Sequence, residues 1–122
     1  MYDQDILNEI NRLNFEDFLL LVFIVLSIIN IYGDYNEKEF IKTSDRKYKN
    51  KANVIFEITL FVTLFIYLYF FIRNYNAYQK AEEKDKKLFI IKLIGSGLLI
   101  AGIICLIYFQ DKQTSFTGTP AL

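Results

Sequence analysis

The feature that most constrains this chain is an apolar stretch at residues 54–72, VIFEITLFVTLFIYLYFFI, which holds one charged residue, Glu57, and neither glycine nor proline. As an α-helix this stretch is about 28 Å long. That length matches the hydrocarbon thickness of a bilayer and far exceeds an ordinary buried strand. The stretch therefore predicts a membrane-spanning helix, which we assign to residues 53–73.

The composition also indicates a lipid-exposed protein. Hydrophobic residues make up 53% of the 122 residues and aromatic residues 17%, which is more apolar surface than a soluble domain of this size can bury. The 14 basic residues equal the 14 acidic ones, so no excess positive charge favours nucleic acid as a partner. We expect a small, all-α integral membrane protein whose first partner is the lipid bilayer.

Two further apolar stretches flank the central one. Residues 15–32 are predicted to form the first span, although their apolar part is short for a full crossing and a shallow or re-entrant segment is the alternative. The helix of this span is expected to begin after an N-cap at Asn14 and to end at Gly33. Residues 88–109, LFIIKLIGSGLLIAGIICLIYF, are predicted to form the third span.

A short segment precedes the first span. Residues 3–13 place apolar side chains at helical spacing with charged residues on the other faces, which predicts a short amphipathic helix. This helix is expected to lie on the membrane surface or to pack against protein. Because the first residues are acidic where a signal peptide is basic, we expect the first apolar stretch to be retained.

Polar segments separate and follow the predicted spans. Residues 34–52 form a polar, basic loop, in which Ser44 and Asp45 are suited to cap the next helix. Residues 74–87 carry opposite charges at i,i+4 spacing and are expected to form a charged helical linker beyond the bilayer. The polar tail at residues 110–122 contains glycine and proline, which argue against further helix.

The orientation in the membrane is weakly determined, because the basic residues are almost evenly divided between the two sides. The acidic N-terminus and the basic loop at residues 34–52 favour an N-terminus outside and that loop in the cytoplasm. Insertion in both orientations, with antiparallel pairing, is the alternative. The richness in Ile, Lys, Asn, Tyr and Phe is compatible with an AT-rich bacterial genome, so the expected location is a bacterial cytoplasmic membrane.

Two charged residues interrupt the apolar stretches of the predicted spans, at residues 18–32, 54–72 and 88–109. An ionised Glu57 costs about 2.5–3.5 kcal/mol at the bilayer centre, which its apolar neighbours offset. Glu57 is interpreted either as an ion or proton site or as a residue that reaches the interface or hydrogen-bonds Ser27 or Asn30. Lys92 is expected to extend its ammonium to the headgroups. Because Glu57 and Lys92 lie towards opposite membrane faces, we expect them to meet only across an antiparallel dimer.

Small and hydroxyl side chains are the remaining polar or packing features of the spans. Thr59 and Thr63 lie four residues apart and are expected to hydrogen-bond their own helix or to reach Ser96. Small side chains let helix backbones approach closely in lipid. Those on one broad side of the third span are therefore predicted to form its helix-packing face: Gly95, Gly97, Ala101, Gly102 and Cys105.

Catalytic patterns are missing from the sequence. With no histidine and a single cysteine, Cys105, the chain offers no cysteine–histidine nucleophile pair and no histidine–cysteine metal cluster. Without a Gly-rich phosphate loop either, we expect no enzyme, no cofactor, no metal and no small-molecule substrate.

The leading hypothesis is a noncatalytic multi-pass protein that associates with other membrane chains or with itself, as an accessory subunit or a self-assembling scaffold. The alternative is a small pore former or transporter, holin-like or a dual-topology channel, with Glu57 in the pathway.

Overall fold

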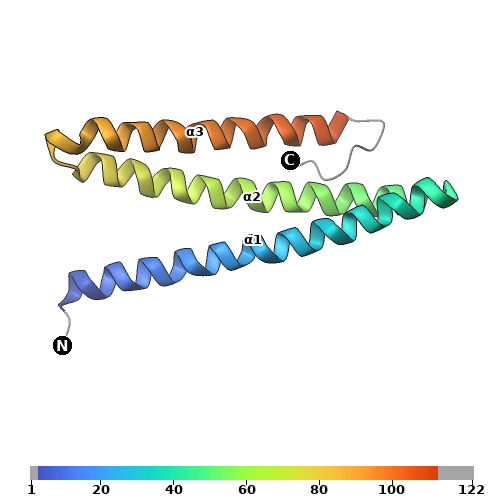
Figure 1. Ribbon diagram of the computed structural model, residues 1–122, viewed down its shortest axis with the longest axis horizontal. Coiled ribbons are helices and arrows are strands. Elements are labelled where there is room, and N and C mark those ends of the chain that lie inside the picture. The colour runs from blue at the N-terminus through green and yellow to red at the C-terminus, as the bar shows by residue number, and fades with distance from the viewer. Residues whose placement is uncertain (1–2, 113–122) are drawn as a thin grey trace.

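The computed structural model describes residues 3–112, which form three long helices joined by short turns (Figure 1). The helices are α1 (Gln4–Thr43), α2 (Arg46–Lys80) and α3 (Glu83–Lys112). Residues 3–112 contain no strand. Each helix is long and apolar enough to cross a membrane. The prediction of an all-α membrane protein with three spanning helices is therefore confirmed.

α1 is one continuous helix of 40 residues, which corrects the sequence-based description of the N-terminal region. The amphipathic helix predicted at residues 3–13 is not a separate element but forms the first turns of α1. The N-cap is Asp3 rather than Asn14, and the Asp3 carboxylate accepts a hydrogen bond of 2.9 Å from the backbone N–H of Ile6. The helix continues because no glycine or proline lies between the amphipathic and apolar stretches.

Gly33 lies inside α1, so the expectation that it ends the helix is wrong. Its missing side chain makes room for the fully buried Phe56 of α2. A Cβ placed at position 33 would lie 2.6 Å from Phe56 Cε1 and 3.2 Å from Ile55 Cγ2. Glycine at this position allows two helices to approach closely, which is a common use of small residues between membrane helices.

The predicted loop at residues 34–52 is helical apart from the turn between α1 and α2. Ser44 takes a left-handed backbone conformation, with a φ of 58°, and its N–H donates to the Phe40 carbonyl at 2.7 Å, which closes α1. The Asp45 carboxylate accepts a hydrogen bond of 3.0 Å from the backbone N–H of Lys47. Asp45 thus caps α2, as its sequence position suggests.

The predicted linker at residues 74–87 is also mostly helical. α2 continues past its apolar stretch to Lys80, and only the turn at residues 81–82 separates it from α3. The first residues of the predicted tail at 110–122 complete α3. Residues 113–122 lie outside the described part of the chain.

The three helices form a single layer with α2 in the middle (Figure 1). α2 packs against both neighbours, whereas α1 and α3 make no contact with each other within residues 3–112. In their apolar stretches only 11% of α1, 22% of α2 and 6% of α3 is buried inside the chain. Most of the apolar surface is therefore left for lipid or for other membrane helices.

The apolar core is narrow and centred on α2. Most buried hydrophobic side chains of the described residues belong to this helix, with one from each outer helix: Leu26, Ala52, Phe56, Leu60, Ile66 and Ile103. Lipid tails are as apolar as these side chains, so the hydrophobic effect does not drive helix against helix in a bilayer. Close packing and hydrogen bonds must hold the layer together.

Replacing Gly33 with leucine is expected to destabilise the folded chain by about 1–3 kcal/mol, because the added side chain overpacks against Phe56. The free energy of unfolding in a mixed-detergent titration, followed by circular dichroism, measures the effect. Gly95→Leu is the matched control, since a Cβ at position 95 meets nothing within 4 Å in the described part of the chain. If both variants were as stable as the unsubstituted chain, the close approach at Gly33 would be contradicted.

Candidate functional site

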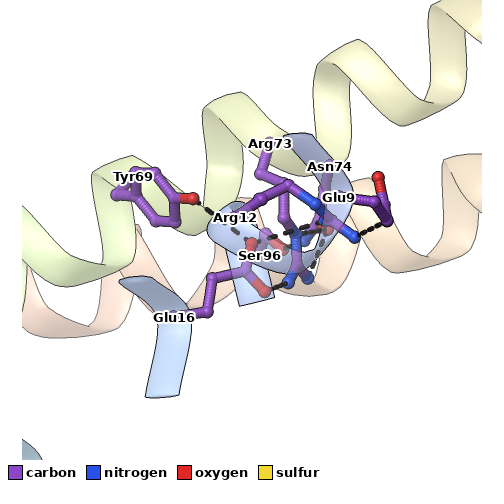
Figure 2. A network of polar contacts seen from close by, with 7 residues as sticks. All are labelled: Glu9, Arg12, Glu16, Tyr69, Arg73, Asn74 and Ser96. Carbon is purple, nitrogen blue, oxygen red and sulfur yellow. Dashed lines mark hydrogen bonds and ion pairs between the residues drawn. The ribbon is translucent and has the colours of Figure 1, made fainter. Parts of the chain in front are cut away.

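A network of polar side chains joins the three helices near the end of the layer that holds the start of α1 (Figure 2). Its centre is Glu16 of α1, whose side chain is only 8% exposed. Arg73 Nη1 of α2 donates to Glu16 Oε1 at 2.7 Å. The Tyr69 hydroxyl donates to Glu16 Oε2 at 3.3 Å, and Arg12 Nη1 lies 3.4 Å from the same oxygen. Two guanidinium groups and a hydroxyl thus surround one buried carboxylate.

Arg73 also connects this network to α3. Its Nε and Nη2 atoms donate to Asn74 Oδ1 at 3.2 and 2.9 Å. Asn74 Nδ2 in turn donates to Ser96 Oγ of α3, and the Ser96 hydroxyl lies 3.1 Å from the Lys92 carbonyl oxygen. Hydrogen bonds therefore run without interruption from α1 through α2 to α3.

The apolar stretches place this network at the boundary of the hydrocarbon core. Arg73 directly follows the apolar stretch of α2, and Glu16 precedes that of α1. A charge at this level is easier to accommodate than one at the bilayer centre, since ends of long side chains reach the headgroups. Ser96 differs because it lies well inside the apolar stretch of α3. Its hydroxyl accepts a hydrogen bond from Asn74, which lies just beyond the apolar stretch of α2.

Further polar contacts connect the helices towards the α1–α2 turn. Thr59 Oγ1 of α2 lies 2.9 Å from Asn30 Oδ1 of α1. Gln110 Nε2 of α3 donates to Asn53 Oδ1 of α2 at 3.3 Å. Each neighbouring pair of helices is therefore joined by polar side chains at two levels, which fixes both the rotation of each helix and its register along the next.

The intramembrane hydroxyl groups lie within hydrogen-bond distance of carbonyl oxygens of their own helix. The hydroxyls of Thr59 and Thr63 lie 3.0 and 2.8 Å from carbonyl oxygens of α2. Across the helix interface, Thr59 reaches Asn30 rather than Ser96. Ser96 lies beside Asn74 instead, several turns further along α2.

Glu57 is half-buried in a groove between α2 and α3 and not against α1. It has no hydrogen bond or ion pair within residues 3–112. Asn30 bonds to Thr59, and Ser27 donates to a carbonyl of its own helix. Lys92 is exposed near the opposite end of the layer, so Glu57 and Lys92 do not meet within the chain. The groove has a volume of about 360 Å³ and is lined by Glu57, Phe61, Ile104, Ile107, Tyr108 and Asp111.

The small residues of α3 face largely away from α2. Gly97 lies against it, since a Cβ there would be 3.7 Å from Phe71 Cε2. A Cβ at Gly95 or Gly102 meets nothing within 4 Å in the described residues. The exposed members of the predicted packing face are Gly95, Ala101, Gly102 and Cys105. Gly97 is therefore the member of this face that lies against α2 in the described residues, and the use of the exposed members against another chain stays a prediction.

Sequence reasoning missed the residues at the centre of the network, because Glu16 and Arg73 lie at the edges of the apolar stretches. A signal for their pairing exists in the sequence. An antiparallel helix pair brings the start of the first apolar stretch beside the end of the second. Glu16 at the start of the first apolar stretch and Arg73 at the end of the second are therefore candidates for an ion pair.

A different contact holds α1 and α2 at the other end of their interface. The ammonium of Lys51, which precedes the apolar stretch of α2, lies 5.0 Å from the ring centroid of Tyr32 on α1. A hydrogen bond with the Tyr32 hydroxyl raises the pKa of Lys51 above its ordinary value. The contact therefore favours the charged form of the lysine at this headgroup level.

Comparisons with known proteins give no family for this chain: no protein family, curated protein or solved structure matches it. Within residues 3–112, no group of three or more His, Cys, Asp or Glu side chains is placed to hold a metal ion.

Glu16 and Arg73 are expected to be energetically coupled by about 1–3 kcal/mol, because removing Glu16 leaves Arg73 without a carboxylate and removing Arg73 leaves the buried Glu16 with only its longer contact to Arg12. A double-mutant cycle with Glu16→Gln and Arg73→Gln, read as the free energy of unfolding in detergent, measures this coupling. The matched control is the pair Lys84–Glu82, whose side chains are 77% and 76% exposed. Its coupling is expected to stay below about 0.5 kcal/mol. Strictly additive effects of the two network substitutions would contradict a structural role for the ion pair.

Proposed function

We propose that this chain is a noncatalytic multi-pass membrane protein that works by helix association, as an accessory subunit of a larger membrane assembly or as a self-assembling scaffold. The observation that carries the proposal is the open layer. In the described part of the chain, α1 and α3 each pack against α2 and not against each other. Each outer helix therefore keeps a broad face that no other helix of the chain covers.

The exposed small residues of α3 are the surface best suited to such association. Ala101, Gly102 and Cys105 project from the side of α3 away from α2. A second helix can approach this side closely and gain dispersion contacts and weak Cα–H hydrogen bonds, which lipid tails do not supply. The partner is another membrane helix, from a different protein or from a second copy of this chain.

The proposed setting is a bacterial cytoplasmic membrane, with the N-terminus outside and the α1–α2 turn in the cytoplasm. Charge supports this orientation. The turns of helix on both sides of the α1–α2 turn are rich in lysine, whereas the first turns of α1 are acidic. Lysine and arginine close to membrane helices favour the cytoplasmic side.

Ala101→Leu and Gly102→Leu are expected to weaken association about five- to tenfold, because each adds bulk where a helix backbone would approach. Energy transfer between donor- and acceptor-labelled copies in vesicles tests a second copy as the partner, and recovery of co-purifying membrane proteins tests a different one. Leu99→Ile is the matched control, since it changes an exposed α3 position without adding volume. Normal insertion together with unchanged association in both leucine variants would count against this face.

A pore former or transporter is the second candidate, and the position of Glu57 is the observation that favours it. Glu57 lines a groove between α2 and α3 that also contains Asp111, and it has no partner within residues 3–112. A single layer of helices encloses no pathway. A holin-like pore or a dual-topology channel would therefore need several copies, with the groove of each copy facing the conduit.

If Glu57 carries conduction, the ion leak from vesicles that contain the chain is expected to fall severalfold in Glu57→Gln, because the amide cannot hold a cation or proton as a carboxylate does. Glu82→Gln, an exposed change outside the apolar stretches, is the control. An unchanged leak in Glu57→Gln removes this residue from the pathway. No leak from the unsubstituted chain removes the pore hypothesis.

A further inference from the structure

A pocket at the α1–α2 interface borders the polar network and shares Arg12 and Arg73 with it. It has a volume of about 310 Å³ and is lined by Glu9, Arg12, Arg73, Asn76, Ala77 and Lys80. Arg73 directly follows the apolar stretch of α2, and Arg12 lies six residues before that of α1. The pocket therefore lies at the level of the lipid headgroups, where phosphate groups are concentrated.

The charges around this pocket leave an excess of positive charge. Glu9 pairs with Arg12, and Glu16 pairs with Arg73. Lys80 also lines the pocket, and no carboxylate within residues 3–112 pairs with it. A ligand group with a single negative charge, such as a phosphodiester, would neutralise this remaining positive charge.

Hydrogen-bond donors of the arginines are also left for a ligand. The Arg12 side chain is 36% exposed, so part of its guanidinium is accessible from outside the chain. The Nη atoms of Arg12 contact Glu9 and Glu16, and each of these nitrogens carries a second N–H. The planar guanidinium matches the oxygens of a phosphate group.

An apolar groove continues from this region along α1 and α2 towards the membrane centre. It begins about one helical turn from the pocket, since Phe15 follows Arg12 on α1 and Tyr69 precedes Arg73 on α2. A charged pocket at headgroup level that leads to an apolar groove matches a phospholipid, with its phosphate outside and an acyl chain inside. The groove has a volume of about 290 Å³ and is lined by Phe15, Leu19, Val22, Val62, Phe65, Ile66 and Tyr69.

We propose that the α1–α2 interface binds one anionic phospholipid, with the phosphate held by Arg12, Arg73 and Lys80 and an acyl chain in the groove beside Phe15 and Tyr69. A zwitterionic lipid fits less well, because its headgroup ammonium would add positive charge to a pocket that already has an excess. A free phosphate ion makes the same contacts with the arginines but leaves the groove empty.

The test uses the full-length chain in neutral detergent, incubated with equal amounts of phosphatidylglycerol and phosphatidylcholine and analysed by native mass spectrometry. Phosphatidylglycerol is expected to be retained about fivefold more than phosphatidylcholine. Lys80→Gln is expected to lower its retention about fivefold, which corresponds to one basic residue near an anionic lipid. Lys84→Gln is the matched control, because Lys84 lies at the same end of the layer, is 77% exposed and does not line the pocket.

Two further variants separate the parts of the proposal. Arg12→Gln is expected to reduce retention as Lys80→Gln does, and Val22→Trp is expected to reduce it by filling the groove while the charges stay in place. Equal retention of the two lipids would overturn the proposal, as would equal losses in Lys80→Gln and Lys84→Gln. Displacement of phosphatidylglycerol by millimolar inorganic phosphate would also overturn it, by assigning the pocket to a free anion.

Discussion

The ion pair between Glu16 and Arg73 is the interaction on which the arrangement of the helices depends most. In a bilayer, apolar side chains gain little from leaving lipid for protein, so helix contacts rest on close packing and on hydrogen bonds. The pair supplies a charged contact 2.7 Å long at the boundary of the hydrocarbon core. Through Asn74 the same arginine also reaches Ser96, so one side chain sets the register of α1 and α3 against α2.

This arrangement leaves α2 with two neighbours and each outer helix with one. Within residues 3–112, the exposed faces of this layer are available for contacts with lipid or with other membrane helices. The outward side of α3 and the α1–α2 interface differ in their chemistry. The outward side of α3 is apolar with small residues, which suits another helix, whereas the interface of α1 and α2 combines cations with an apolar groove, which suits a lipid.

The sequence predicts the three spans well because an apolar stretch of membrane length has one stable solution in lipid, a helix that satisfies its own backbone. Helix ends are harder to predict, because local cap signals at Asn14 and Gly33 compete with continuation of the helix. Gly33 shows why: its role is set by Phe56 of a different helix. The polar partners are hardest, since Thr59 meets Asn30 through the rotation and register of two helices, which hydropathy does not encode.

The distance between α1 and α3 tests most directly whether α2 separates these two helices. Spin labels are placed at Val25 and Ile104, which are both exposed, in a Cys105→Ser background. The labelled chain is diluted with unlabelled chain in lipid vesicles, and pulsed electron paramagnetic resonance measures the distance. Packed helix axes lie about 8–10 Å apart, so a layer places the axes of α1 and α3 about 16–20 Å apart. The single-layer arrangement predicts this larger separation, with a Val25–Phe61 pair as the reference for adjacent helices. An α1–α3 separation equal to that reference would show a closed three-helix bundle and contradict the layer.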